Sequence, residues 1–410
     1  TKILIKLPIY IIATIPCLII RLISPFFLIR IESIPCANFG DFVYFVSIYY
    51  CQKQLKVNQP KQTCFDLFYF YHKHKNYNKQ LEKMWRRKLI FLSSYLLDPI
   101  NKVNRIFPGW EKFTIEIIST KLQWDVDNLF EKYQALNFTD EEEVLGKKNL
   151  KKFGLSDNDK FVCLAVRDAA YGKIKDPTGR LDFSYNDFRN SDISNFKLAC
   201  EELAKKGYYI FRMGVVAEKA FNSNNPKIID YVNSELKSDF MDIYLGAKCT
   251  FCISTGLGFD NLPYVFGRPI ALANVPLADT RTHSKKFLLL TKHHFLRKEK
   301  RKLSISEIFS HGLSFAFDSK IYERKGVELI DYTPEEIRDF VLEMHDKLEH
   351  NKKMSNEDED LQKTFQKLFD SNYKSFHDEI TKNTRWYKLH NEVKAQFSTN
   401  FLRNNKSWLR

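Results

Sequence analysis

The stretch DFMDIYLGAKCTFCISTGLGFDNLPYVFGRPIALAN, from Asp239 to Asn274, decides the fold of this chain. Residues 241–248 predict a short helix, 249–254 a brief strand, 259–266 a second helix and 270–274 the next strand. The turn Thr255-Gly256-Leu257-Gly258 follows the first strand, at the end where open α/β sheets bind ligands. Glycine lets the backbone approach an anion, and the N–H groups of a helix start favour phosphate. We therefore predict a βαβ unit with an anion-binding turn; the alternative is a tight turn without a ligand.

The composition indicates a globular protein. The chain has 410 residues, of which 44% are hydrophobic and 15% aromatic, so we expect two domains with substantial cores. A formal charge of +14 suits nucleic acid, a membrane surface or an anionic substrate. Much of this charge is lysine scattered through an asparagine-, lysine- and isoleucine-rich sequence, and no compact nucleic-acid motif is present. We predict no nucleic-acid partner.

The cysteines and histidines do not form a recognisable metal site. Eight cysteines at irregular spacings favour a reducing compartment over a disulfide framework. Cys249 and Cys252 form a CxxC pair, but residues three apart on a strand face opposite sides, and no second pair completes a site. His293 and His294 are adjacent, so we expect them at the surface or facing an anion. The sequence predicts neither a metal nor a cofactor.

Residues 1–30 are predicted to associate with a membrane. The apolar run 7–20 is short for a span, is interrupted by Pro8 and Pro16, and continues into 22–31. We interpret it as an interfacial anchor whose basic residues, Arg21 and Arg30 among them, face anionic headgroups. A transmembrane helix and a buried first helix are the alternatives.

The remaining chain predicts two α/β domains and a tail. In the first domain, residues 31–155, we expect strands at 28–34 and 63–71 and helices at 42–54 and 78–97, the last with Met84, Trp85, Leu89 and Leu92 inward. A charged helical stretch at 131–152 precedes the junction. The second domain spans 156–350, and a helical tail at 351–410 follows, within which 386–402 is a candidate to cross back to the first domain.

Polar residues follow three predicted strands of the second domain. They are Arg167-Asp168 after strand 161–166, Arg212-Met213-Gly214 at the end of strand 208–213, and Ser254-Thr255-Gly256. A loop of about 20 residues precedes the helix at 193–206, and loops of this length are usually functional or mobile. Its arginines suit phosphate or carboxylate. Asp192 and Asn190 have a second interpretation, as a helix cap and a turn residue. We expect the three strand ends to converge on one crevice.

This ordered set of motifs resembles a known family. The segments VRDAAY (166–171), FSYNDFRNSDI (183–193), GYYIFRMG (207–214), STGLGFDNLPYVFGRPI (254–270) and TPEEI (333–337) are similar to those of bacterial glycosyltransferase-like proteins found with surface-polysaccharide genes. The resemblance is strong over 161–347 and weak before it. It implies a GT-B fold, in which two Rossmann-like domains face a cleft and the C-terminal one holds a nucleotide sugar. Where this chain has Ala169 the family usually has serine, so any role of that hydroxyl is absent.

The resemblance also implies a function and a donor site. We expect transfer of a sugar from a nucleotide-sugar donor to a hydroxyl acceptor, lipid-linked or glycan, on the cytoplasmic face of the inner membrane, without a metal. Its motif positions, together with Gly258 of the turn, are Arg167, Asp168, Tyr171, Tyr185, Arg189, Asn190, Asp192, Arg212, Gly214, Ser254, Thr255, Gly256 and Asp260. A nucleotide-sugar epimerase or hydrolase and a non-catalytic membrane-bound binding module are the alternatives.

Asp41 is the candidate catalytic base. A hydroxyl acceptor must lose its proton to a group within hydrogen-bond reach, and Asp, Glu or His can take it. Asn38-Phe39-Gly40-Asp41 follows the first predicted strand and resembles the Gly-Asp turn of heptosyltransferase-like GT-B enzymes, whose aspartate is the proposed base. The alternative is that Asp41 only caps the following helix. His72 and His74 are the reserve candidates.

Overall fold

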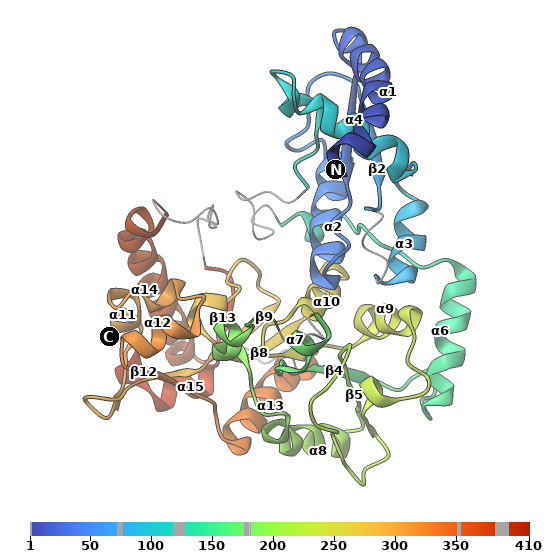
Figure 1. The fold of residues 1–410 in the computed structure, drawn as a ribbon. Coiled ribbons are helices and arrows are strands. Elements are labelled where there is room, and N and C mark those ends of the chain that lie inside the picture. The colour runs from blue at the N-terminus through green and yellow to red at the C-terminus, as the bar shows by residue number, and fades with distance from the viewer. Residues whose placement is uncertain are drawn as a thin grey trace. The chain divides into compact units, whose positions relative to one another are not determined.

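The chain forms two compact units in the computed structural model, which describes residues 2–71, 77–117, 128–175, 180, 182–350, 354–381 and 393–410 (Figure 1). The first unit comprises Thr1–Ser119 and Leu129–Thr139, and Asp140–Arg410 belong to the second. The division therefore comes before the expected junction at 155. Helix α6 (Asp140–Lys152) is part of the second unit because it packs on α9 (Asp239–Lys248), where Lys248 Nζ lies 2.6 Å from Glu143 Oε1.

The first unit is built on a parallel sheet of order β1-β2-β3, with helices on it. Its described elements in chain order are α1 (Lys2–Ile23), β1 (Leu28–Ser33), α2 (Phe39–Leu55), β2 (Cys64–Tyr69), α3 (Lys79–Arg86), β3 (Ile90–Phe91), α4 (Ser94–Asn104) and α5 (Leu129–Lys132). The strands predicted at 28–34 and 63–71 and the helix at 42–54 are confirmed. Helix α2 buries side chains on all sides, which suits its uniformly apolar and aromatic sequence.

The single helix predicted at 78–97 is wrong. Helix α3 ends at Arg86, Ile90–Phe91 form β3 beside β2, and α4 begins after Ser93, whose hydroxyl caps it. Leu92 is exposed, whereas Met84 and Trp85 are fully buried as expected. Local signals explain the break, because Ile90-Phe91 favours a strand and Ser93 favours a helix start.

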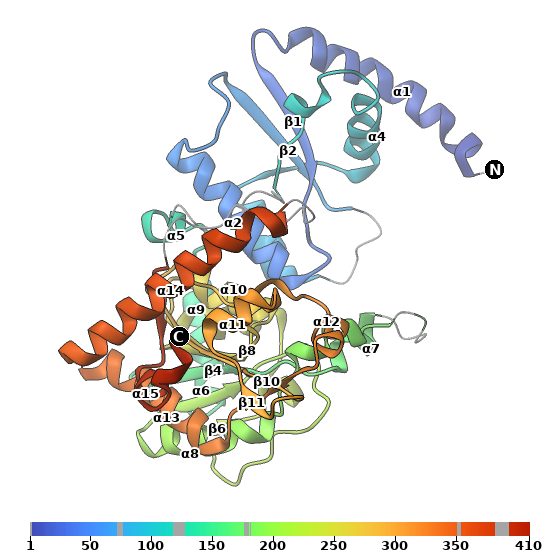
Figure 2. The same ribbon diagram turned by 90° about the vertical axis from the view of Figure 1, so that its left-hand side faces the viewer.

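Helix α1 runs without interruption through Pro8 and Pro16. One of its faces belongs to the core of the first unit, where Ala13 and Cys17 pack against α4 and β1, and Figure 2 shows α1 beside α4. Apolar residues on another face are exposed. The expected placement of the basic residues is wrong: Arg21 Nη1 donates to Asn104 Oδ1 at 2.7 Å, and Arg30 pairs with Asp66 at 2.6 Å. Within the described residues, no helix is long and apolar enough to cross a membrane.

The second unit contains a parallel sheet of order β13-β9-β8-β7-β4-β5-β6. Its strands are β4 (Phe161–Ala165), β5 (Tyr209–Arg212), β6 (Ile228–Ile229), β7 (Cys252–Ser254), β8 (Ile270–Val275), β9 (Phe287–Thr291) and β13 (Gln396–Phe397). From β4 the chain adds β5 and β6 on one side, then returns to add β7, β8 and β9 on the other. The doubly wound order therefore reverses between β4 and β7, the place where such sheets bind ligands.

Helices cover both faces of this sheet. Figure 1 shows α9 and α10 (Asn261–Val265) on one face and α8 (Lys197–Lys205) and α13 (Pro334–His350) on the other. The other described helices are α7 (Ala170–Lys175), α11 (Ile305–Ser310), α12 (Ser319–Arg324), α14 (Asn356–Thr381) and α15 (Thr399–Asn404), with short 3-10 turns between. The helix-strand-turn-helix-strand order predicted over 241–274 is confirmed.

The second unit also contains a small antiparallel sheet that was not predicted and a C-terminal stretch that was predicted to cross to the first unit. An antiparallel sheet of order β11-β10-β12 joins Arg301–Lys302, His293–Leu296 and Val327–Ile330. His293 and His294 are buried in it, not at the surface. Residues 386–392 lie outside the described residues. The rest of the proposed crossing stretch stays with the second unit, because β13 pairs with β9 and α15 packs on α13 and α14.

Candidate functional site

Three strand ends meet at the carboxyl edge of the second unit's sheet. Strand β4 lies between β5 and β7, so the residues after Ala165, Arg212 and Ser254 are neighbours. This confirms the expected convergence, and it occurs where the strand order reverses. Doubly wound sheets bind ligands at the point where the strand order reverses, so a ligand site is expected at this edge.

The turn after β7 is held by a buried carboxylate. Asp260 Oδ2 accepts hydrogen bonds from Ser254 Oγ at 2.8 Å and from the Leu257 N–H at 3.0 Å, while Asp260 Oδ1 lies 2.6 Å from Arg281 Nη2. Ser254 Oγ also accepts from the Gly256 N–H at 3.1 Å. Ser254 and Asp260 are fully buried. Their contacts favour a role in shaping the turn over direct contact with a ligand.

Gly256 is required by the packing beneath the turn. Its φ of +79° is a conformation that other residues rarely adopt. A Cβ there would lie 3.1 Å from Val275 Cγ1 and 3.2 Å from Asp279 Oδ2. Gly258 begins the 3-10 turn Gly258–Asp260, and buried Thr255 accepts a hydrogen bond at its Oγ1 from the Arg167 N–H at 2.8 Å. The turn therefore fixes the backbone of Arg167.

Arg167 and Arg189 form a cationic pair next to this turn. Arg189 Nη2 donates to the Gly256 carbonyl at 2.8 Å and lies 2.6 Å from Asp279 Oδ2. Arg167 makes no ion pair with any described residue, and its Nε has no hydrogen-bond partner among them. Burial lowers the pKa of Arg167, and the positive charge of Arg189 lowers it further. Asp279 pairs with Arg189, and Arg167 has only the longer-range attraction of Asp279 and Asp187, so a bound anion would stabilise its charge.

Arg212 occupies a different environment. It is 2% exposed, its Nη1 lies 3.2 Å from Asp230 Oδ1, and its Nη2 lies 3.8 Å from Asp168 Oδ2. Asp168 also accepts at Oδ1 from the Ala170 N–H and at Oδ2 from the Glu218 N–H. These contacts join the loops after β4 and β5, so burial favours a structural role for Arg212 over phosphate binding. The Gly214 carbonyl accepts from Lys237 Nζ beside them.

The loop after β4 divides into exposed and structural residues. Tyr171 and Tyr185 are 38% and 42% exposed, so their rings are accessible. Asp192 caps the 3-10 turn Ile193–Phe196 by accepting from the Ser194 N–H at 2.9 Å, and Asn190 Nδ2 donates to Asp187 Oδ1 at 2.9 Å. The capping and turn-closing interpretations of Asp192 and Asn190 are thus confirmed.

A pocket of about 500 Å³ adjoins this loop. Its acidic lining residues are Asp187, Asp192, Glu323, Glu328 and Asp331, and its basic ones are Lys292 and Arg297. Lys292 Nζ is engaged by Asp331 Oδ1 at 2.9 Å and by the Asn190 carbonyl at 2.5 Å. Because acidic groups outnumber basic ones, the pocket suits hydroxyl-rich groups better than phosphate.

The first unit carries the candidate base. Asp41 is half-buried in the first turn of α2, while the cap position belongs to Asn38, whose Nδ2 donates to Asp41 Oδ2 at 2.9 Å. A carboxylate in a first turn is favoured by the helix dipole whether or not it has a catalytic role. His72 and His74 lie outside the described residues.

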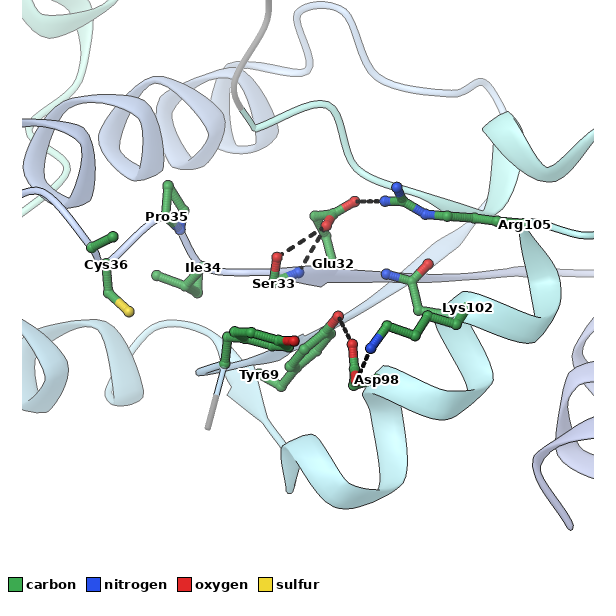
Figure 3. A pocket seen from close by; sticks show the side chains of 12 residues that line it. Glu32, Ser33, Ile34, Pro35, Cys36, Tyr69, Asp98, Lys102 and Arg105 are labelled. Atoms are coloured by element: carbon green, nitrogen blue, oxygen red, sulfur yellow. Dashed lines mark hydrogen bonds and ion pairs between the residues drawn. The ribbon is translucent and has the colours of Figure 1, made fainter. Parts of the chain in front are cut away.

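A second pocket, of about 350 Å³, lies at the carboxyl ends of β1 and β2 (Figure 3). We call it the Glu32 pocket. It is lined by Glu32 and Ser33 of β1, residues 34–37 after it, Tyr69 and Tyr71 at the end of β2, and Asp98, Asn101, Lys102 and Arg105 on and after α4. Burial raises the pKa of Glu32, against the opposing effects of the Ser33 N–H and Arg105.

One group of side chains within the described residues has the spacing of metal ligands. Atoms of His345, Asp346 and His350 on α13 lie within 4.8 Å of one another. His345 packs on Tyr208, which precedes β5, so the group is at the amino edge of the sheet. It is therefore separate from the arginine pair.

Sequence reasoning missed Asp279, Arg281 and Glu32. Asp279 and Arg281 follow β8 at the same carboxyl edge, and this position was an available signal. Glu32 gave a weaker signal, a charged residue near the end of a buried strand. Neither signal identifies the partner residues, which come from distant parts of the chain.

No protein-family model and no curated protein matches this chain. Among solved structures it is similar to a glycosyl transferase family 9 protein from Veillonella parvula, with a TM-score of 0.44 and 10% identity over 80% of this chain and 98% of that one. It is also similar to the dodecameric iron-containing heptosyltransferase TibC, solved with ADP-D-beta-D-heptose (TM-score 0.39, 11% identity, 78% of this chain and 77% of that one). A third similar structure is E. coli ADP-heptose lps heptosyltransferase II, with a TM-score of 0.29 and 12% identity over 59% of this chain and 84% of that one.

Proposed function

We propose that this chain is a glycosyltransferase that moves a sugar from a nucleotide-sugar donor to a hydroxyl acceptor in bacterial surface-polysaccharide or glycoconjugate biosynthesis. The observation that carries the proposal is Arg167, a cation without an ion pair among the described residues, which lies beside Arg189 at the reversal point of a doubly wound sheet. A donor diphosphate supplies the negative charge that this pair lacks, and guanidinium groups bind phosphate oxygens in a fork. The motif resemblance over 161–347 supports the same assignment.

The reaction has simple chemical requirements. The acceptor oxygen forms a bond to the anomeric carbon, the bond from that carbon to the donor's phosphate oxygen breaks, and the nucleotide leaves with the electron pair on that oxygen. Arg167 and Arg189 stabilise the negative charge that develops on the leaving group, so no metal is required in this proposal. Asp41 takes the proton from the acceptor hydroxyl. Arg212, Ser254, Thr255 and Asp260 hold the strand-end loops that place the arginines.

The test is a thermal-denaturation screen against UDP-, GDP-, CMP- and TDP-sugars, followed by a transfer assay with saccharide acceptors. A ligand at 100 times its dissociation constant should stabilise the protein by about 2.7 kcal/mol. We expect one nucleotide class to stabilise the chain and its sugar to be released only when an acceptor is present. Turnover independent of an acceptor would favour an epimerase or hydrolase. Absence of saturable nucleotide binding would favour a non-catalytic module.

We also propose that α1 holds the enzyme at the cytoplasmic face of the inner membrane, where lipid-linked acceptors are found. The support is a row of exposed apolar side chains on a helix whose other face packs on α4. The row comprises Leu7, Ile9, Ile11, Ile12, Ile15, Leu18, Ile19 and Leu22. Exposed apolar surface of this kind inserts into the headgroup boundary, and the net charge of +14 favours anionic lipid.

Liposome cosedimentation tests the membrane proposal. Wild-type protein should pellet with anionic vesicles, and Ile12→Gln combined with Ile15→Gln, which leaves the net charge unchanged, should remove most of that binding. Val144→Gln combined with Leu145→Gln on α6 is the control, since both are exposed apolar residues outside α1. Equal binding by the wild type and the α1 double variant would contradict the proposal.

A further inference from the structure

The Glu32 pocket has no role in the donor chemistry above. It is formed within the first unit, where the carboxyl ends of parallel strands β1 and β2 meet the face of α4 (Figure 3). This end of a parallel sheet is where ligands bind. The volume of about 350 Å³ is at the lower end of the range for small-molecule sites, so it suits one small ligand or the end of a larger one.

The charges in the Glu32 pocket cancel. Glu32 Oε2 lies 3.2 Å from Arg105 Nη2, and Asp98 Oδ2 lies 2.6 Å from Lys102 Nζ. Figure 3 shows these two ion pairs. Two carboxylates and two cations give the lining no net charge, so the pocket offers an anion little attraction. The charged groups equally make it unsuitable for a purely apolar ligand.

Hydrogen-bonding capacity remains on both sides of each ion pair. Glu32 Oε1 accepts from the Ser33 N–H and hydroxyl, and Asp98 Oδ1 accepts from the Tyr69 hydroxyl at 3.3 Å. A carboxylate has about four acceptor sites and an ammonium group has three donors, so these contacts with described residues do not saturate either group. Spare donors and acceptors side by side match a group that both donates and accepts, which is a hydroxyl.

Asn101 adds further hydrogen-bonding capacity to the pocket, beside the hydrogen bond that its side chain shares with Tyr69. It lines the pocket from α4, is only 4% exposed, and its Oδ1 has no hydrogen-bond partner among the described residues. A buried polar atom without a partner is costly and is usually satisfied by water or a ligand. The Tyr69 and Tyr71 rings and residues 34–36 supply apolar lining beside these polar groups. The mixture suits a sugar ring, which has an apolar C–H face and a rim of hydroxyls.

We propose that the Glu32 pocket binds the acceptor as an uncharged sugar residue, with Glu32, Asp98 and Asn101 accepting hydrogen bonds from its hydroxyls. This rests on the proposed transferase function and specifies its acceptor. The lining ends at Ala37, in the loop that leads into the first turn of α2, where Asp41 lies. The pocket therefore belongs to the same strand-to-helix connection as the proposed base.

The experiment measures binding of neutral methyl glycosides and neutral oligosaccharides to the full chain by saturation-transfer NMR. Glu32→Gln keeps the shape of the side chain and removes its charge, so affinity should fall on the order of 10- to 100-fold. Ala37 is an exposed residue of the lining, so Ala37→Trp adds bulk to the pocket, leaves the polar side chains unchanged and should abolish binding. Glu111→Gln is the matched control, because Glu111 is an exposed carboxylate of the same unit outside the pocket lining, and it should bind like wild type.

Donor binding is measured separately, by the thermal shift with nucleotide sugars. All three variants should keep that shift, and the transfer defect of Glu32→Gln and Ala37→Trp should be an increase in acceptor KM, with Glu111→Gln unchanged. If nucleotide sugars bind but neutral saccharides do not, or if Glu32→Gln and Ala37→Trp both bind saccharide normally, the acceptor assignment is overturned while the transferase proposal stands. Binding of anionic sugars alone would also overturn it. If the protein binds no nucleotide sugar, but binds neutral saccharides and loses that binding in Glu32→Gln and Ala37→Trp, the transferase proposal is refuted while the sugar site stands.

Discussion

Arg167→Met should weaken nucleotide binding while leaving the unliganded protein as stable as wild type or more stable. Arg167 makes no ion pair with a described residue, and both burial and the nearby Arg189 disfavour its charge. Methionine keeps an apolar stem and removes the guanidinium. The free protein therefore loses a like-charge contact, whereas a bound diphosphate loses one of its two cations.

The size of the binding effect follows from the type of contact. A hydrogen bond to a charged group contributes about 1.5–3 kcal/mol, so the dissociation constant should rise about ten- to hundredfold. At a concentration 100 times the wild-type constant, a ligand stabilises wild type by about 2.7 kcal/mol, which raises the Tm of a chain of this size by roughly 3–5 °C. A hundredfold weaker site retains about 0.4 kcal/mol, or roughly 1 °C.

Thermal denaturation with and without nucleotide sugar provides the assay, and Arg212→Met is the contrasting variant. Arg212 is buried against Asp230, so its loss should reduce stability by about 3–5 kcal/mol even without ligand. If Arg167→Met shows the full wild-type nucleotide shift, the phosphate does not lie at Arg167. If it unfolds as easily as Arg212→Met, the account of Arg167 as an uncompensated cation is wrong.

Three further outcomes are expected. Asp41→Asn should keep the stability of α2 and lower turnover by about 10²- to 10⁴-fold in a transfer assay, and near-normal turnover in the folded variant would remove Asp41 as the base. Asp260→Asn should lower stability by about 3–5 kcal/mol in urea denaturation because it removes the buried carboxylate charge that lies against Arg281, and a loss of nucleotide affinity at unchanged stability would instead make Asp260 a donor ligand. Burial lowers the pKa of His294 to about 4, so the unfolded chain takes up this proton first as pH falls. Stability should drop between about pH 6.5 and 4, by on the order of 3 kcal/mol from this group, and His294→Gln should make the profile less steep in that window. The remaining slope would come from buried His293, whose pKa is lowered to about 3, and an unchanged profile would contradict a buried neutral His294.

The folding pattern of the second unit was predictable because its signals are local. Apolar runs of strand length, glycine turns and amphipathic helices alternate over 161–274, and each is specified by residues a few positions apart. The meeting of Arg167, Arg212 and Ser254 at one edge follows from the same pattern once the strands are parallel. The cap at Asp192 and the turn at Asn190 were also predictable from the sequence, since their hydrogen-bond partners lie within three residues.

Prediction from neighbouring residues failed where a helix pattern and a strand pattern overlap in the sequence. The helical periodicity at 78–97 continues through Leu89 and Leu92, but the pairing of β3 with β2 takes two residues out of the helix. That pairing depends on a strand more than twenty residues away. Likewise Arg21 and Arg30 look like headgroup ligands in the sequence, whereas Asn104 and Asp66 bind them in the fold.

By itself the sequence determined the α/β class, the parallel second unit and the strand-end residues from which a site is built. Only the tertiary structure decided which of these residues are available to a ligand. It buried Arg212 and Asp260 among partners, left Arg167 beside Arg189 without an ion pair among the described residues, and placed α4 over Glu32 to form a pocket. Secondary structure is specified by short-range periodicity, which can be recognised in the sequence. Burial and charge pairing depend on contacts between segments that are distant in the sequence, and the sequence does not show which of those segments are close in space.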